Sequence, residues 1–176
     1  MRELATGESI DRFFRSLGER AASPSRVYVT GGATAVLLGL RASTVDIDLK
    51  LIPESDEILR AIPRLKEELR INVELAAPDQ FIPPLPGWQE RSRFIRLEGR
   101  IAFYHYDFYA QALAKIQRGH GKDLADARGL VAEGLVDPER LFELFERIEP
   151  DLFRYPAIDP SSFRRAVEEF VSAPPR

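Results

Sequence analysis

The feature of this 176-residue chain that most constrains its fold is a stretch at residues 26–52. It begins with a short apolar run at 27–29, which predicts a buried strand. The pair Gly31-Gly32 follows, and an apolar segment at 33–40 then predicts a helix. Glycines at the start of a helix leave its backbone N–H groups unobstructed, and such groups can hold phosphate. The pair could instead form only a tight turn between strand and helix.

After this helix the chain alternates between apolar and polar residues, which is the periodicity of a strand. The apolar face carries Val45, Ile47, Leu49 and Leu51, and the polar face carries Asp46, Asp48 and Lys50. Two carboxylates two residues apart on one strand face are suitable ligands for a divalent metal such as Mg²⁺. The alternative is an edge strand whose carboxylates simply face water.

Composition removes several classes of function. The chain has no cysteine, which excludes disulfides, thiolate zinc sites and cysteine nucleophiles. Its formal net charge of -3 provides no global basic field to attract nucleic acid, although a local basic patch remains compatible with it. The chain shows no charged-then-apolar leader and no apolar run near about 18 residues, so we expect a cytoplasmic protein that does not bind membranes.

The remaining patterns predict the elements around this stretch. Before residue 107 we expect a helix at 8–21, a helix at 54–69 that Pro63 kinks or splits, a strand at 71–75, a proline-rich loop at 78–88, and a hairpin of 94–97 and 101–106 around Gly99. After it we expect helices from Asp107 to Arg118, at 122–133, from Pro138, and from about Pro160 to a point before Pro174.

The strand at 71–75 also alternates, with Ile71, Val73 and Leu75 on one face and Asn72 and Glu74 on the other. If it neighbours the acidic strand, Glu74 lies beside Asp46 and Asp48. The alternative for Glu74 is a solvated face.

Other residues that could take part in chemistry have a structural interpretation as the first expectation. His105 is expected to be half-buried and hydrogen-bonded rather than a metal ligand. Four aromatic side chains could stack on a base, but we expect them to pack in the core or at interfaces: Trp88, Tyr104, Tyr106 and Tyr109. Four arginines lie close together in the sequence and could contact an anion, but we expect them on a solvated face of the hairpin: Arg91, Arg93, Arg96 and Arg100.

Gly31-Gly32 followed by Asp46-Ile47-Asp48-Leu49 resembles the signature of the nucleotidyltransferase superfamily. The segments 114–118 and 122–126 are similar to the lysine and the Asp-x-x-Asp element of AbiEii-type nucleotidyltransferase toxins. The chain also resembles a bacterial family of nucleotidyltransferase-like proteins of unknown function. One departure is Gly32, where the AbiEii-type proteins usually carry serine, so a hydroxyl is replaced by a backbone N–H alone.

The order of the expected elements predicts an α+β or α/β fold with a mixed sheet, flanking helices and a helical C-terminal part, and the resemblance implies that this is the nucleotidyltransferase fold. It implies a core at residues 1–106 and a helical part at 107–176 that packs on it as one compact unit. The implied activity is Mg²⁺- or Mn²⁺-dependent transfer of a nucleotide from an NTP to a hydroxyl acceptor, RNA such as tRNA or protein. The implied partner is the cognate antitoxin of a toxin–antitoxin pair.

The resemblance also assigns roles. Metal ligands would be Asp46, Asp48 and a third carboxylate, for which Glu74 is the first candidate and Asp79 the second. Glu74 could instead act as a base for the hydroxyl. Residues that would contact nucleotide are Gly31, Gly32, Thr34, Lys50 and Asp123, and Lys115 would neutralise the departing pyrophosphate.

Each role in the second half has a structural alternative. Lys115 could be a surface lysine, and Asp123 could cap a helix or pair with Lys122 or Arg118. Asp126 is expected to pair with its neighbours. For the whole chain, the alternative is a module without catalysis that keeps the fold and binds a nucleotide or a protein.

Overall fold

A computed structural model describes residues 3–173 of the chain. The chain forms two compact units. The first comprises Met1–Ala77 and Ser92–Tyr106, and the second comprises Pro78–Arg91 and Asp107–Arg176. The sequence predicts two domains, a core at residues 1–106 and a helical part at 107–176, and this division stays a prediction.

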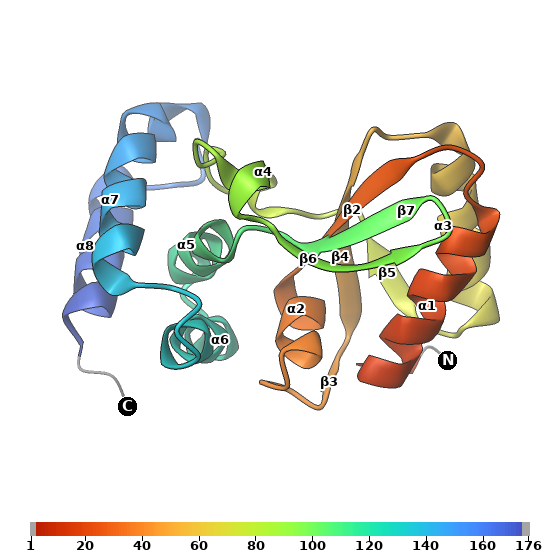
Figure 1. Ribbon diagram of the computed structural model, residues 1–176. Coiled ribbons are helices and arrows are strands. Elements are labelled where there is room, and N and C mark those ends of the chain that lie inside the picture. The colour runs from red at the N-terminus through yellow and green to blue at the C-terminus, as the bar shows by residue number, and fades with distance from the viewer. Residues whose placement is uncertain (1–2, 174–176) are drawn as a thin grey trace. The chain divides into compact units, whose positions relative to one another are not determined.

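A five-stranded mixed sheet forms the centre of the first unit, in the order β5-β4-β2-β7-β6 (Figure 1). Its strands are β2 (Ser25–Thr30), β4 (Asp46–Ile52), β5 (Asn72–Glu74), β6 (Arg93–Glu98) and β7 (Ile101–His105). The pairs β2–β4 and β6–β7 are antiparallel, and the pairs β2–β7 and β4–β5 are parallel. The acidic strand β4 therefore lies inside the sheet, and the edge-strand alternative is wrong.

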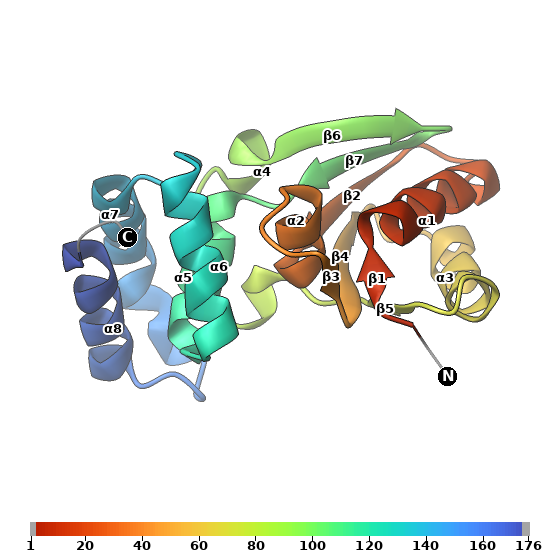
Figure 2. The same ribbon diagram turned by 90° about the horizontal axis from the view of Figure 1, so that it is seen from below.

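Three helices cover one face of this sheet: α1 (Gly7–Arg20), α2 (Gly31–Leu37) and α3 (Asp56–Glu68). Figures 1 and 2 show α1 and α3 side by side. The buried core between helices and sheet includes Phe14 of α1, Val36 of α2 and Leu65 of α3. On the sheet it includes Ile47, Leu49 and Leu51 of β4 together with Val73 of β5. The predicted alternation of β4 is thus confirmed, and its carboxylates face away from the core.

Three details differ from the sequence prediction. Val45 lies before β4 and is exposed, because the strand begins only at Asp46. Leu75 lies just after β5 and is also exposed. Helix α3 continues through Pro63 without a break. Buried Ile62 and Leu65 hold the turns around this proline on the same face of the sheet, which offsets the lost backbone hydrogen bond.

A second small sheet was not predicted. It pairs β1 (Ala5–Thr6) with β3 (Ser43–Thr44), so the start of the chain is joined to the turn between α2 and β4. Two-residue strands have no readable periodicity, which explains the omission. The pairing places Thr44 close to the glycine pair.

The second unit is helical. Its helices are α4 (Trp88–Arg91), α5 (Phe108–Arg118), α6 (Gly121–Ala132), α7 (Pro138–Ile148) and α8 (Pro160–Ser172), with short 3₁₀ segments η1 (Pro78–Gln80) and η2 (Glu149–Arg154). Asp107 caps α5 by accepting from the N–H of Tyr109, and Asp137 caps α7 by accepting from the N–H of Arg140. The predicted caps Asp107 and Asp137 and the predicted break after α5 are confirmed, and the structure adds that Gly119 at this break is left-handed. The alternative of Asp123 as a cap is wrong, because the N-cap residue of α6 is His120.

The described residues thus form a mixed α+β fold, as predicted from the sequence. Within 3–173, no helix has the length and apolar character needed to cross a membrane.

Candidate functional site

The glycine pair lies directly against the acidic strand. Gly31 begins α2 with a φ of +65°, a conformation that side-chain-bearing residues rarely adopt. A Cβ added at Gly31 would lie 2.6 Å from Oδ2 of Asp48. The carboxylate of Asp48 therefore occupies the space that a side chain at position 31 would need, and the fold brings together the two halves of the Gly-Gly and Asp-x-Asp pattern.

The second glycine, Gly32, is needed because Thr44 lies close to its backbone. A Cβ added at Gly32 would lie 2.1 Å from the hydroxyl oxygen of Thr44 and 2.8 Å from its Cβ. Thr44 is held there by the pairing of β3 with β1. A serine at position 32, as in the AbiEii-type proteins, would therefore collide with Thr44 unless this segment moved. The departure from Gly-Ser thus has a steric reason in this chain.

The strand register places the predicted carboxylates on one face. In the parallel pair of β4 and β5, Asp48 lies opposite Glu74 and Asp46 lies opposite Asn72. These four side chains face away from the helices, because the residues between them, such as Ile47, are buried in the core. Asp79, the other candidate for a third carboxylate, lies in η1 of the second unit.

Asn72 links the carboxylates on this face. Its amide donates to Oδ1 of Asp46 at 2.5 Å and to Oε1 of Glu74 at 3.0 Å. The periodicity of β5 puts Asn72 on the face of Glu74, but only the register reveals that Asn72 lies opposite Asp46. Residues 3–173 contain no group of three acidic or histidine side chains placed to hold one metal ion, and the role of Glu74 as a third ligand stays a prediction.

Behind the glycine pair lies a buried polar contact. Thr34 is 2% exposed, and its hydroxyl donates to the carbonyl of Val29 at 3.1 Å. The same hydroxyl oxygen lies 3.2 Å from Nδ1 of His105, a hydrogen bond in which the tautomer of His105 sets the donor. His105 is buried rather than half-buried as expected. Burial, with a smaller contribution from the charge of Arg93, lowers the pKa of His105 to about 4. The Thr34 hydroxyl is thus engaged within the first unit, and its contact with nucleotide stays a prediction.

Lys50 also lies on the polar face of β4, where it pairs in register with Tyr28 of β2. Its position is two residues beyond Asp48, so its ammonium and the two carboxylates belong to the same surface.

The predicted residues of the second half form an ion-pair cluster inside the second unit. The buried ammonium of Lys115 lies 2.7 Å from Asp126 and 3.5 Å from Asp123. The guanidinium of Arg118 donates twice to Asp123, at 2.7 and 3.1 Å. Burial acts to raise the pKa of Asp123, but Arg118 and Lys115 outweigh it and lower the pKa. The expectation of a surface lysine is wrong, and the expected pairings of Asp123 with Arg118 and of Asp126 with a neighbour are confirmed.

A comparison with known protein families identifies the family of this chain. The family described as nucleotidyltransferase of unknown function (DUF6036) matches residues 8–170 of the 176. The chain belongs to this family. No curated protein and no solved structure matches the chain. The match includes both units, so Asp46 and Asp48 as well as Lys115 and Asp123 lie within the family sequence.

The donor set of this DUF6036 member suits magnesium. Mg²⁺ in proteins is commonly held by one or two carboxylates, with water and substrate phosphates as its other ligands. Asp46 and Asp48 provide two hard oxygen donors from one strand face, and each is only partly exposed. Asn72 takes one oxygen of Asp46, which leaves the other oxygen of this carboxylate to serve as a ligand.

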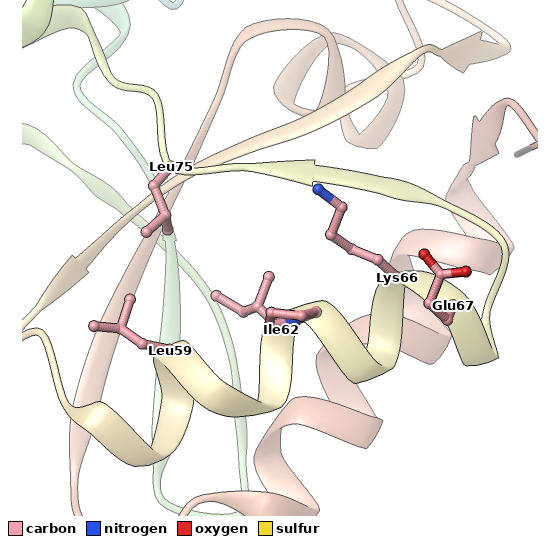
Figure 3. Close-up of a pocket in the computed structure, with 6 residues that line it drawn as sticks. Leu59, Ile62, Lys66, Glu67 and Leu75 are labelled. Atoms are coloured by element: carbon pink, nitrogen blue, oxygen red, sulfur yellow. The ribbon is translucent and has the colours of Figure 1, made fainter.

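A shallow pocket elsewhere in the first unit of this DUF6036 member does not involve the acidic strand. Figure 3 shows it between α3 and Leu75, with Leu59 and Ile62 toward Leu75 and with Lys66 and Glu67 at one end. None of the residues expected to hold metal or nucleotide lines this pocket.

Proposed function

We propose that this protein is a Mg²⁺-dependent nucleotidyltransferase, which transfers a nucleotide from an NTP to a hydroxyl acceptor. The observation that carries the proposal is the contact between Gly31 and the carboxylate of Asp48, within a chain that matches the family over residues 8–170. A glycine turn packed on an acidic strand supplies phosphate donors and metal ligands at one place.

In this proposal Asp46 and Asp48 hold the magnesium. When bound, Mg²⁺ supplies a positive charge that stabilises the phosphates during displacement. The backbone N–H groups of Gly31 and Gly32 face the triphosphate, and Lys50 adds a positive charge on the same strand face. These groups orient the NTP so that its α-phosphate is presented to the acceptor.

Glu74 takes the role of base rather than that of third metal ligand. It is exposed and lies opposite Asp48, whereas the described residues contain no three-carboxylate metal group. An exposed carboxylate beside the metal ligands can accept the proton of an incoming hydroxyl. Asn72 fixes its position by donating to Oε1.

The remaining assignments rest on the resemblance. We propose that Lys115 and Asp123 contribute to nucleotide or pyrophosphate binding from their ion-pair cluster, and that the protein is the toxin of a toxin–antitoxin pair. RNA, such as tRNA, and protein are both candidate acceptors, and a cytoplasmic location stays a prediction.

One observation favours a second function, a nucleotide-binding or protein-interaction module without catalysis. The amide of Asn72 lies between Asp46 and Glu74 and donates to both. It therefore occupies the place where a third carboxylate would complete a metal site. Such a module would bind NTP and leave it unchanged.

A transfer assay separates the two functions. The purified protein is incubated with Mg²⁺, each of the four NTPs labelled at the α-phosphate, and a pool of cellular RNA and protein. We expect label on one class of macromolecule, and a loss of about 10²–10³-fold for Asp48→Asn, since one electrostatic group is removed from the transition state. Asp46→Asn should show a similar loss while keeping the Oδ1 that Asn72 contacts.

The matched control is Asp56→Asn, the same change at an exposed carboxylate of the first unit. It should leave transfer unchanged. NTP binding is measured in parallel by calorimetry. Binding without transfer by the unmodified protein would refute the enzyme and support the binding module, and equal transfer by the Asp48 variant and the control would refute the site.

A further inference from the structure

The face of the sheet that carries Asp46 and Asp48 also carries a row of aromatic rings. Tyr28 of β2 pairs with Tyr104 of β7, and Tyr104 pairs with Phe94 of β6. Paired residues on neighbouring strands point to the same face, so these rings form a row across three strands. We call these three rings, Tyr28, Tyr104 and Phe94, the aromatic row.

The rings contact one another in ordered geometry. Tyr28 and Tyr104 stack with centroids 5.4 Å apart, and Phe94 meets Tyr104 edge to face at 5.5 Å and 72°. Tyr28 is buried, Tyr104 is half-buried, and Phe94 is 56% exposed. The row therefore ends in an exposed ring whose position is fixed by the tyrosine behind it.

A bulge in β6 enlarges the exposed end of the row. The register shifts between Phe94 and Arg96, so that Phe94 faces Tyr104 and Leu97 faces Ala102. Without the shift, residues three apart would point to opposite faces of the sheet. The bulge instead puts Phe94 and Leu97 on the same face of β6, which is an edge strand, and Leu97 is 63% exposed.

Positive charge borders the rings. Arg26 is exposed and lies two residues before Tyr28 on β2, so the two side chains are on the same face of the sheet. Lys50 pairs with Tyr28 from the other side. Aromatic faces bordered by cations suit a nucleobase and its phosphate, because every base has a face that can stack and every nucleotide carries a negative charge.

Resting on the proposed function, we propose that the aromatic row binds the acceptor, and that this acceptor is single-stranded nucleic acid with an unpaired base on Phe94 and a phosphate at Arg26. An NTP held by its α-phosphate at Asp46 and Asp48 would keep its base near these carboxylates, whereas Phe94 lies farther across the sheet. The strand β4 of Asp48 and the strand β6 of Phe94 are three strand spacings apart, which is about 14 Å. A chain of nucleotides spans this distance, and a single nucleotide held by its α-phosphate does not.

A duplex would not use the row, since its bases are stacked on one another and their faces are hidden. An acidic protein partner would be drawn to Arg26 and Lys50 but gains nothing specific from a ring that stacks. These differences separate the proposal from its competitors in one binding experiment.

The test measures the affinity of a fluorescein-labelled, short single-stranded RNA of mixed sequence by anisotropy, with the duplex of the same sequence as comparison. Phe94→Leu keeps an apolar side chain but removes the ring, and we expect about tenfold weaker binding, within the range for one stacked base. Phe94→Tyr keeps the ring and should bind like the unmodified protein. Arg26→Gln should reduce the salt dependence of binding by about one phosphate contact.

The matched control is Phe153→Leu, the same change at a 74% exposed phenylalanine of the second unit. The proposal is overturned if the single-stranded RNA does not bind, or if the Phe94→Leu and Phe153→Leu variants bind it equally well. It is also overturned if the duplex binds as tightly as the single strand, or if Phe94→Leu weakens only the association with protein. Asp48→Asn should bind the RNA normally while its transfer falls by about 10²–10³-fold. Transfer to protein alone would refute the aromatic row as the acceptor site and would leave the proposed nucleotidyltransferase activity standing. Phe94-dependent RNA binding without any transfer would refute the activity and would leave the aromatic row as a binding site for RNA.

Discussion

Lowering the pH should destabilise the fold through His105, and the size of the effect follows from its burial. His105 is 7% exposed and its Nδ1 lies 3.2 Å from the hydroxyl of Thr34. Burial, aided by the charge of Arg93, lowers its pKa from 6.5 to about 4. The folded protein therefore keeps this imidazole neutral at pH values where the unfolded chain binds a proton.

The sign and the magnitude follow from proton linkage. Above about pH 6.5 neither state binds the proton, so the neutral imidazole contributes its full stability there. Between about pH 6.5 and pH 4 the unfolded state binds one more proton than the folded state, and the free energy of unfolding falls as the pH falls. Each pH unit costs about 1.36 kcal/mol, so the difference of about 2.5 units costs about 3 kcal/mol.

The assay is urea unfolding of the unmodified protein and of His105→Asn from about pH 7 to about pH 4. Asparagine keeps a polar group near Thr34 but does not titrate, so the variant should lose about 3 kcal/mol less over this range. The control is His120→Asn at the exposed start of α6, which should follow the unmodified protein. Parallel curves for the unmodified protein and His105→Asn would refute the reasoning.

The other predictions concern stability and are checked by the same urea unfolding at neutral pH. Gly32→Ala should cost about 1–3 kcal/mol through its collision with Thr44, and Thr44→Gly in the same chain should recover part of this loss; additive losses would contradict the contact. Lys115→Met should cost about 3–5 kcal/mol because it leaves Asp126 buried without its cation, and a loss below about 1 kcal/mol would count against a buried pair. Pro63→Ala should stabilise α3 by about 1–2 kcal/mol, since a backbone donor returns at an exposed helical position; destabilisation would contradict this account of the helix.

The elements that could be predicted are those whose signals are local. The alternation of β4 requires only seven consecutive residues, and the face it assigned to Asp46 and Asp48 is the observed one. The start of α7 is specified by Asp137 and Pro138, a cap and a helix-compatible first residue. The hairpin of β6 and β7 follows from Gly99, whose positive φ suits the turn between two short apolar strands.

Pairing between distant segments could not be predicted in the same way. The partner of β3 is β1, nearly forty positions earlier in the chain, and each strand has only two residues. The bulge in β6 is also invisible to a periodicity of two, because it makes residues three apart share a face. Burial at strand ends depends on where pairing stops, which is why Val45 and Leu75 were assigned to the wrong environment.

The candidate site combines both kinds of information. The glycine pair was predicted to be a phosphate turn, and the structure adds that Asp48 fills the space beside Gly31, so the same glycine that frees the backbone also admits the carboxylate. Asn72 could be interpreted only after the register of β4 and β5 was known. A carboxylate has two oxygens with about four acceptor positions, so an amide that donates to one oxygen of Asp46 orients this side chain and leaves room for a ligand. The contact that favours a non-catalytic module is therefore also compatible with a metal ligand held in position, which is why the transfer assay, rather than the geometry of Asn72, decides between the two functions.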